Sequence, residues 1–143
     1  MRIKDRFVFD TNTLVSAVLF EHSKPGQAFR RALQVGNVML SPSTLAELSE
    51  VLERDKFDLY VTPLEREEFL EGLLDRAMVL EPTETIRECR DAKDDKILEL
   101  AVTAHASHIV TGDGDLLVLH PFREIKIVTP DEFLKVIFED TSE

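Results

Sequence analysis

Short strand-like runs alternate with longer helix-like stretches along almost the whole chain. The strand-like runs are rich in apolar residues, many of them β-branched, and cover residues 6–9, 38–40, 78–80, 108–111 and 125–128. Strands that alternate with helical stretches in this way are typical of βαβ units, in which parallel strands are joined by crossover helices. The pattern therefore predicts an α/β fold class with layers of helix around a mainly parallel sheet.

Capping residues mark several helix boundaries. Thr62 and Glu65 form a capping box with Pro63 at the first helical position, and Gly36 is suited to end a helix that begins near Ser23. The expected helices cover residues 14–19, 23–36, 41–52, 62–77, 94–106 and the stretch after 129. We expect a single domain over residues 1–138, followed by a frayed tail over residues 139–143.

The net charge limits the ways in which this chain can bind other molecules. It has 17 Lys and Arg against 28 Asp and Glu, a formal net charge of −11. Such an excess argues against a broad electrostatic grip on nucleic acid. It is compatible with a small carboxylate site that binds a metal ion and acts on one phosphodiester, because the ion would cancel much of the local charge.

The compartment is indicated by cysteine usage and hydropathy. Cys89 is the single cysteine, so an intrachain disulfide framework is excluded and a reducing, cytoplasmic environment is expected. No apolar run approaches the ~20 residues that a membrane-spanning helix needs. We therefore expect a cytoplasmic chain with no membrane partner.

Two acidic residues follow strand-like runs that lie far apart in the sequence. Asp10 comes directly after residues 7–9, and Asp113 directly after residues 109–112. If the two runs are neighbouring parallel strands, both carboxylates lie at the carboxyl edge of the sheet, where open α/β sheets bind ligands. Like charges so close would raise the pKa of one carboxyl unless a cation lay between them. Carboxylates without His or Cys favour Mg²⁺ or Mn²⁺.

Each of these acids also has a purely structural interpretation. Asp10 could cap a helix, Glu47 could close a capping box with Thr44, and Asp113 and Asp115 could belong to a glycine-rich turn. Taken alone, each structural interpretation is strong. Taken together with the acids at residues 91–95, they make four acidic positions at strand ends or helix starts on one expected edge, which favours a common site.

Helical periodicity predicts which of the acids at the start of the helix over residues 94–106 points inward. Residues 97, 98, 101 and 104 define its apolar face, and at about 100° per residue Asp94 falls near the centre of that face. Asp95 falls on the flank. An inward carboxylate needs a partner, which can be a metal ion or a backbone cap. We favour Asp94 as the functional member of the group.

Four segments together resemble the PIN-domain ribonucleases, and among them the VapC-like toxins of type II toxin–antitoxin systems. The segments are Phe9-Asp10-Thr11-Asn12, Glu47 within Leu-Ala-Glu-Leu, residues 91–96 (Asp-Ala-Lys-Asp-Asp-Lys), and residues 110–116 (Val-Thr-Gly-Asp-Gly-Asp-Leu). The resemblance extends from residue 6 to about residue 133. One departure is Ala92, which stands where the family usually has proline.

The resemblance implies a three-layer α/β/α sandwich and a metal-dependent endoribonuclease that uses Mg²⁺ or Mn²⁺. It also implies an RNA substrate, a cognate antitoxin protein and a homodimer. Carried over by position, Asp10, Glu47, Asp94 and Asp113 are the expected catalytic and metal-binding residues, with Asp115 as a further metal ligand. Asn12, Thr111 and Asp95 are the expected supporting residues.

The sequence shows no strong basic groove for a nucleic acid. Six basic side chains are candidates for phosphate contacts, although solvated surface is the favoured interpretation for most of them: Lys24, Arg30, Arg31, Lys93, Lys96 and Arg123.

Two other functions stay open at the level of sequence. One is a phosphotransfer domain similar to a response-regulator receiver, which is also small, acidic and Mg²⁺-dependent. That function needs paired acids after the first strand and a lysine after a late strand, whereas this chain has only Asp10 and then Thr129-Pro130. The other is a catalytically silent binding module whose acids hold a metal or a protein partner.

Overall fold

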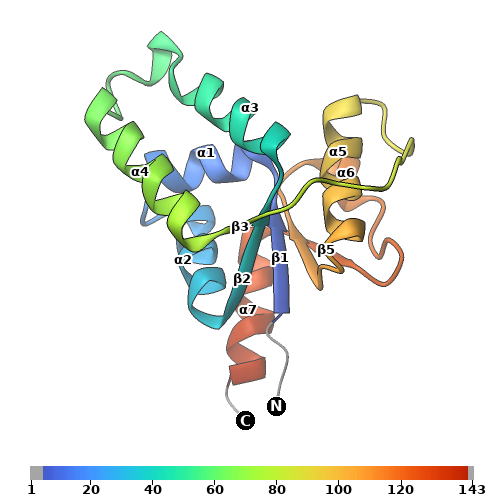
Figure 1. Cartoon of the computed structure of the whole chain (residues 1–143). Coiled ribbons are helices and arrows are strands. Elements are labelled where there is room, and N and C mark those ends of the chain that lie inside the picture. Colours follow the sequence, from blue (N-terminus) through green and yellow to red (C-terminus); the bar gives the residue numbers. More distant parts are fainter. Residues whose placement is uncertain (1–4, 142–143) are drawn as a thin grey trace.

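Five parallel strands form one sheet in the order β3-β2-β1-β4-β5 (Figure 1). The structure is a computed structural model in which residues 5–141 are described. The strands are β1 (Asp5–Phe9), β2 (Gly36–Leu40), β3 (Met78–Val79), β4 (His108–Val110) and β5 (Lys126–Val128). All five strand-like runs are confirmed, and the parallel sheet with them.

Helices connect and cover these strands. They are α1 (Thr11–Leu19), α2 (Lys24–Val35), α3 (Pro42–Leu52), α4 (Pro63–Arg76), α5 (Ala92–Thr103), α6 (Gly114–Leu117) and α7 (Pro130–Thr141), with a 3-10 turn η1 at Asp55–Phe57. The side chains of Ser23, Ser41 and Thr62 cap α2, α3 and α4, and the predicted capping box of Thr62 with Glu65 is present. Local capping chemistry therefore fixes where these helices begin.

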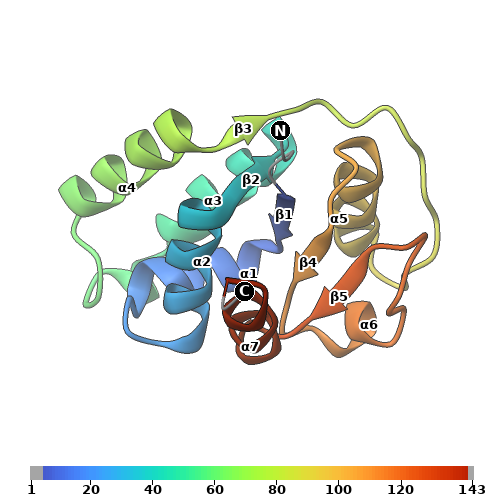
Figure 2. The same cartoon turned by 90° about the horizontal axis from the view of Figure 1, so that it is seen from below.

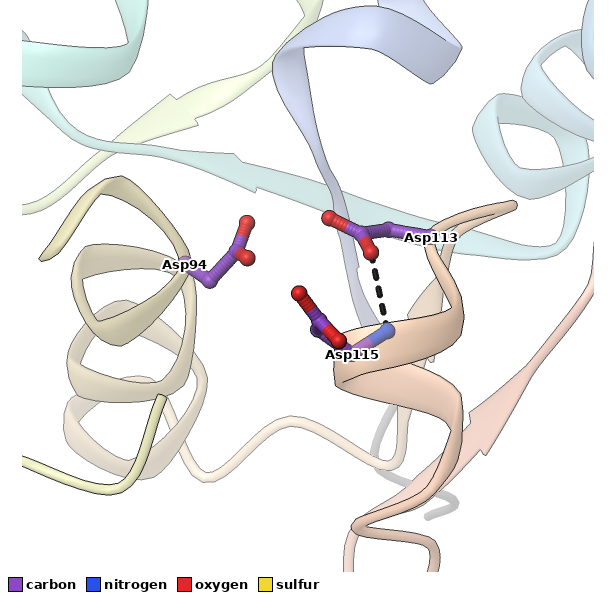
Figure 3. A group of neighbouring side chains, drawn as sticks. All are labelled: Asp94, Asp113 and Asp115. Atoms are coloured by element: carbon purple, nitrogen blue, oxygen red, sulfur yellow. Dashed lines mark hydrogen bonds between the residues drawn. The ribbon is translucent and has the colours of Figure 1, made fainter. Parts of the chain in front are cut away.

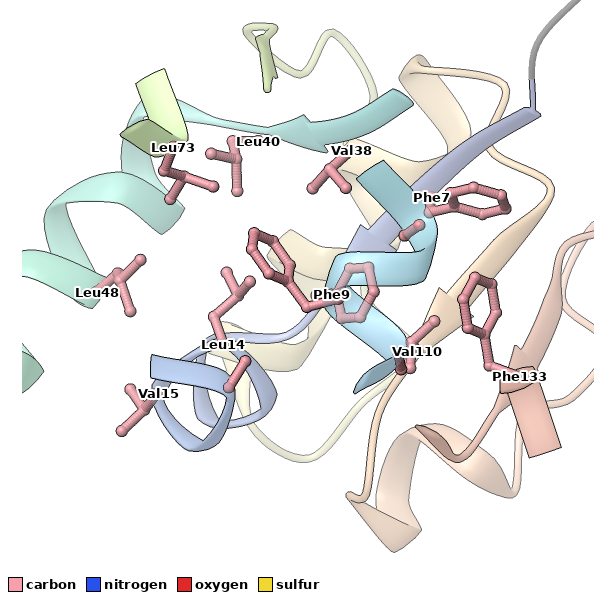
Figure 4. Close-up of a cluster of buried hydrophobic side chains, with 14 of the residues drawn as sticks. Phe7, Phe9, Leu14, Val15, Val38, Leu40, Leu48, Leu73, Val110 and Phe133 are labelled. Carbon is pink, nitrogen blue, oxygen red and sulfur yellow. The ribbon is translucent and has the colours of Figure 1, made fainter. Parts of the chain in front are cut away.

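The strand side chains alternate between two cores, as expected for a sheet covered on both faces. Phe7, Phe9 and Val110 point to the first core (Figure 4), which α1, α2, α3, α4 and α7 complete. Val8 and Ile109 point to the second core, which α5 and α6 cover. In Figures 1 and 2 the sheet lies between these two groups of helices. The three-layer α/β/α sandwich is thus confirmed.

The strand order creates a switch point between β1 and β4. From β1 the chain proceeds outward to β2 and β3, then crosses to the other side of β1 to form β4 and β5. Phe9 and Val110 are paired at the carboxyl ends of the two central strands. In open parallel sheets, ligands bind in the crevice outside such a switch point. Asp10 and the segment from Thr111 onward begin at that crevice.

Helix α7 continues through Thr141, so the backbone of residues 139–141, expected to be frayed, is helical. Residues 142–143 of that expected tail and residues 1–4 of the expected domain lie outside the described residues. Among the described helices, none combines the length and apolar character that crossing a membrane requires.

Candidate active site

Three carboxylates converge at the carboxyl edge of the sheet. Asp94 lies in the first turn of α5, Asp113 caps α6, and Asp115 lies in the first turn of α6. Each offers one carboxylate oxygen, and these oxygens lie within 4.8 Å of one another. Figure 3 shows the three side chains pointing toward a common centre. Converging carboxylate oxygens are the donor set that Mg²⁺ and Mn²⁺ prefer.

The acids that follow the two central strands are linked through Thr111. Its fully buried hydroxyl donates to Oδ2 of Asp10 at 2.5 Å and accepts from the backbone N–H of Asp113 at 3.0 Å. The other Asp10 oxygen, Oδ1, accepts from the N–H of Thr13 at 2.8 Å and thereby caps α1. The structural interpretation of Asp10 is therefore correct, but its second oxygen is directed to the switch point.

The electrostatics of the cluster favour a cation. Burial, followed by the negative charge of Asp113, raises the pKa of Asp94 from its ordinary value to about 6, and Asp91 and Asp10 add to the effect. This is the response expected when several carboxylates crowd together without enough compensating charge. A divalent cation would relieve that repulsion, so the residues fit a metal ion.

One of the three carboxylates already has a cationic neighbour. Arg90 places a guanidinium nitrogen 3.0 Å from Oδ1 and 3.2 Å from Oδ2 of Asp115. The Arg90 side chain is 87% exposed, so water screens this ion pair and it balances the charge of Asp115 only in part. Sequence reasoning missed Arg90; its position immediately before the acidic start of α5 was the available signal.

The periodicity argument for α5 was wrong about which aspartate is buried more deeply. Asp95 is buried, whereas Asp94 is half-buried. The segment over residues 80–91 packs against the start of α5, and Oδ1 of Asp95 accepts from the N–H groups of Glu88 at 2.9 Å and Cys89 at 2.8 Å. Although burial acts in the opposite direction, these bonds lower the pKa of Asp95. Asp95 therefore holds this segment in place.

Two other predicted site residues lie near the cluster but outside the group of three. Oε1 of Glu47 on α3 is 3.9 Å from Nζ of Lys93 on α5, which places Glu47 beside the first turn of α5. Asn12, on the first turn of α1, lines a cleft of about 490 Å³ that also contains Asp10 and Asp113. The structure thus places all the predicted acids around one edge of the sheet.

The six basic candidates are distributed more widely. Lys24 lines the same cleft, and Lys93 and Lys96 lie in the first turns of α5, where Lys96 contacts Oγ of Ser43 at 3.4 Å. Arg123 precedes β5 and therefore lies toward the opposite edge of the sheet. Arg30 donates to the backbone oxygen of Glu21 and Arg31 to Gln34. The sequence-based preference for solvated surface fits Arg30 and Arg123 best, because both are exposed, whereas Arg31 is half-buried.

Comparison with known proteins then decides the family. The PIN domain family matches residues 6–115, a span that includes every acid of the cluster. The chain belongs to the PIN domain family. It is also similar to protein MJ1680 of Methanocaldococcus jannaschii, with 28% identity over 144 residues that cover 94% of this chain and 92% of that protein.

The PIN domain also has a similar solved structure. It is the crystal structure of VapBC2 from Rickettsia felis bound to a DNA fragment from their promoter, with a TM-score of 0.56 and 16% sequence identity. The similarity covers 86% of this chain and 96% of the matched chain. At this identity the likeness supports the fold, in agreement with the three layers described above.

Proposed function

We propose that this PIN domain is a metal-dependent endoribonuclease and the toxin of a toxin–antitoxin pair. The observation that carries the proposal is the convergence of Asp94, Asp113 and Asp115 at the switch point beside Asp10. PIN domains are typically nucleases, and phosphodiester hydrolysis is the reaction for which such an oxygen-only site is suited.

Within this proposal the carboxylates have separate tasks. Asp10, Asp94 and Asp113 would hold Mg²⁺ or Mn²⁺, with Asp115 and Glu47 completing the set. When bound, such an ion lowers the pKa of a water molecule and neutralises negative charge that develops on the phosphate. Thr111 keeps one Asp10 oxygen oriented through its hydrogen bond. Arg90 is placed to balance Asp115.

An antitoxin is the proposed protein partner. The similar structure from Rickettsia felis is that of VapBC2, which supports pairing with a second protein here. The net charge of −11 suits a basic partner segment. Both proteins would act in the cytoplasm, the compartment that the single cysteine favours.

A homodimer is also part of the proposal. Leu74 at the end of α4 and Met78 and Val79 of the edge strand β3 are 46–52% exposed. Exposed apolar side chains on a sheet edge favour pairing with another chain. Molar mass from light scattering of the purified protein tests this part; a monomer across the accessible concentrations would refute it.

The nuclease proposal is tested by cleavage of a mixed single-stranded RNA pool by the purified protein. The reactions contain Mg²⁺, Mn²⁺ or EDTA, and compare the wild type with Asp94→Asn. Asp75→Asn, at an exposed position of α4, is the matched control. We expect cleavage by the wild type and the control only with metal, and a loss of about 100-fold or more in Asp94→Asn. Equal cleavage by both variants, or cleavage in EDTA, would contradict the proposal.

A further inference from the structure

The cleft beside the acidic cluster extends away from it between three helices. At one end it is lined by Asp10, Gly112 and Asp113. Its walls come from α1, the first turn of α2 and the start of α7: Asn12, Thr13, Ser16, Lys24, Pro25, Thr129, Pro130 and Asp131. At about 490 Å³ it falls in the size range of sites that bind small ligands. Because Asp10 and Asp113 line it, a ligand group bound in this cleft would lie next to the phosphodiester at the proposed metal site.

Lys24 is the one cationic side chain among the described residues that line this cleft. Its Nζ lies 3.6 Å from Oδ1 of Asp131, while Nζ of Lys135 lies 3.2 Å from Oδ2 of the same carboxylate. Asp131 is thus shared by two ammonium groups, and the hydrogen bond and charge of Lys135 are the main reason that its pKa is lowered. Because Lys135 already neutralises Asp131, Lys24 retains positive charge to offer to a ligand.

We propose that Lys24 binds a backbone phosphate of the single-stranded RNA substrate, next to the phosphate that is cleaved. This inference rests on the proposed function, and it adds the position of the RNA strand relative to the acidic cluster. The Lys24 side chain is 59% exposed, so its ammonium group can reach a strand that enters the cleft beside Asp10 and Asp113. Because the chain as a whole repels a polyanion, a cation at this position offsets part of that repulsion. The hydroxyl of Ser16 and the amide of Asn12 add hydrogen-bonding groups to the same wall.

The residues that line the cleft indicate which part of a nucleotide it can bind. None of its described lining residues is aromatic, so it lacks the stacking platform on which single-stranded binders hold bases. Contacts from Lys24 and hydroxyl groups go to phosphate and sugar, which position a strand without reading its sequence. The nucleotide seated here is thus held by its backbone.

The test measures binding of a short fluorescent single-stranded RNA across a range of salt concentrations, in an Asp94→Asn background with Mg²⁺ so that the RNA stays intact. Lys24→Ala is compared with Lys135→Ala, which removes the other partner of Asp131 but no cleft residue. We expect Lys24→Ala to weaken binding by about 3- to 10-fold and to reduce the salt slope by about 0.7, the value for one contact to a single strand. Asp131→Asn should tighten binding. Equal affinity and slope for the two lysine variants, or no RNA binding by the parent, would overturn the inference.

Cleavage kinetics of the otherwise wild-type enzyme separate this inference from the proposed function. Lys24→Ala should raise KM by a similar factor and leave kcat nearly unchanged, as expected for a contact made equally before and during the reaction. A fall in kcat without a change in KM would contradict the inference and leave the nuclease proposal standing. If instead no metal supports cleavage but RNA binding still depends on Lys24, the nuclease proposal fails, and with it the placement beside a cleaved phosphate, while the contact of Lys24 with RNA stands.

Discussion

At the scale of single residues, the buried hydroxyl of Thr111 explains how the two central strands share one site. It donates to Asp10, which directly follows β1, and accepts from the backbone N–H of Asp113, which lies after β4. A hydroxyl can serve both groups because it has one donor hydrogen and two lone pairs. Thr111 thereby holds two acidic residues close together without adding charge of its own.

The raised pKa of Asp94 leads to a prediction about stability. Because the folded chain binds this proton more tightly than the unfolded chain, the contribution of Asp94 to the free energy of unfolding falls as pH rises through about 4 to 6. In EDTA at about pH 7, Asp94→Asn should therefore be more stable than the wild type by roughly 1 kcal/mol after solvent screening. Near pH 4 the difference should vanish. Urea unfolding at both pH values measures it.

A matched variant controls that comparison. Asp75→Asn makes the same chemical change at an exposed position outside the cluster, and should show no such pH-dependent gain. If Asp94→Asn were less stable than the wild type in EDTA at neutral pH, the crowding of negative charge around Asp94 would be refuted.

The sequence predicted some of these residues better than others. The proximity of Asp10 and Asp113 could be predicted from the sequence, because neighbouring parallel strands end at the same edge of the sheet. The order of burial of Asp94 and Asp95 was predicted wrongly, because the periodicity argument assumes that neighbouring elements cover only one face of the helix. Here the irregular segment over residues 80–91 covers Asp95 as well. An irregular segment has no periodic pattern, so its contacts with α5 could not be predicted from the sequence.

At the scale of elements, the segment before α5 is predicted to depend on Asp95. Asp95→Ala removes the acceptor of two backbone N–H groups and should lower the free energy of unfolding by about 2 kcal/mol. The same segment carries Cys89, whose pKa is raised to about 12 by burial and by Asp95. Alkylation of this thiol by iodoacetamide, followed by mass spectrometry, should be slow in the wild type and faster in the variant.

Asp91→Ala is the control for this prediction. The side chain of Asp91 caps α5 by accepting from the N–H of Lys93 rather than bonding the backbone of the segment. Its loss should therefore lower the free energy of unfolding by about 1 kcal/mol and leave Cys89 protected. Equal thiol reactivity in Asp95→Ala and the wild type would show that Asp95 does not hold the segment.

The corner between α1 and α2 makes a second prediction at this scale. A methyl group on Gly26 would lie 2.8 Å from the backbone oxygen of Phe20 and closer still to that of Glu21. Gly26→Ala should therefore destabilise the fold by about 2 kcal/mol. Gly72→Ala on α4, where a methyl group meets nothing within 4 Å, should instead be neutral or stabilising by up to about 1 kcal/mol. Thermal unfolding of the two variants compares them; destabilisation of both would count against the close approach at Gly26.

Helix boundaries were predictable where a side chain caps the backbone. Ser23 and Thr62 mark the starts of α2 and α4 in the sequence, and the structure agrees. The start of α1 was placed too late because Asp10 itself is the cap, so the helix begins at Thr11. The segment of α6 was expected to be a glycine-rich turn. It is instead a helix of four residues, with Asp113 as its N-cap.

At the scale of the whole molecule, the fold concentrates negative charge where strand order reverses. The chain carries a net charge of −11, and part of that excess meets at the carboxyl ends of β1 and β4. Such a concentration is costly unless a cation is bound, so metal binding should stabilise the fold by linkage. Acidity that argues against broad nucleic-acid binding thus agrees with a metal site that handles one phosphate.

The most direct test of this account is Mn²⁺ binding, followed by electron paramagnetic resonance of the free ion. We expect the wild type and Asp75→Asn to remove Mn²⁺ from solution, and Mg²⁺ to compete for the same site. Asp113→Asn should bind at least 10-fold more weakly, because it loses one carboxylate of the converging group. Undiminished Mn²⁺ binding by Asp113→Asn, or no binding by the wild type, would contradict the assignment of this edge as a metal centre.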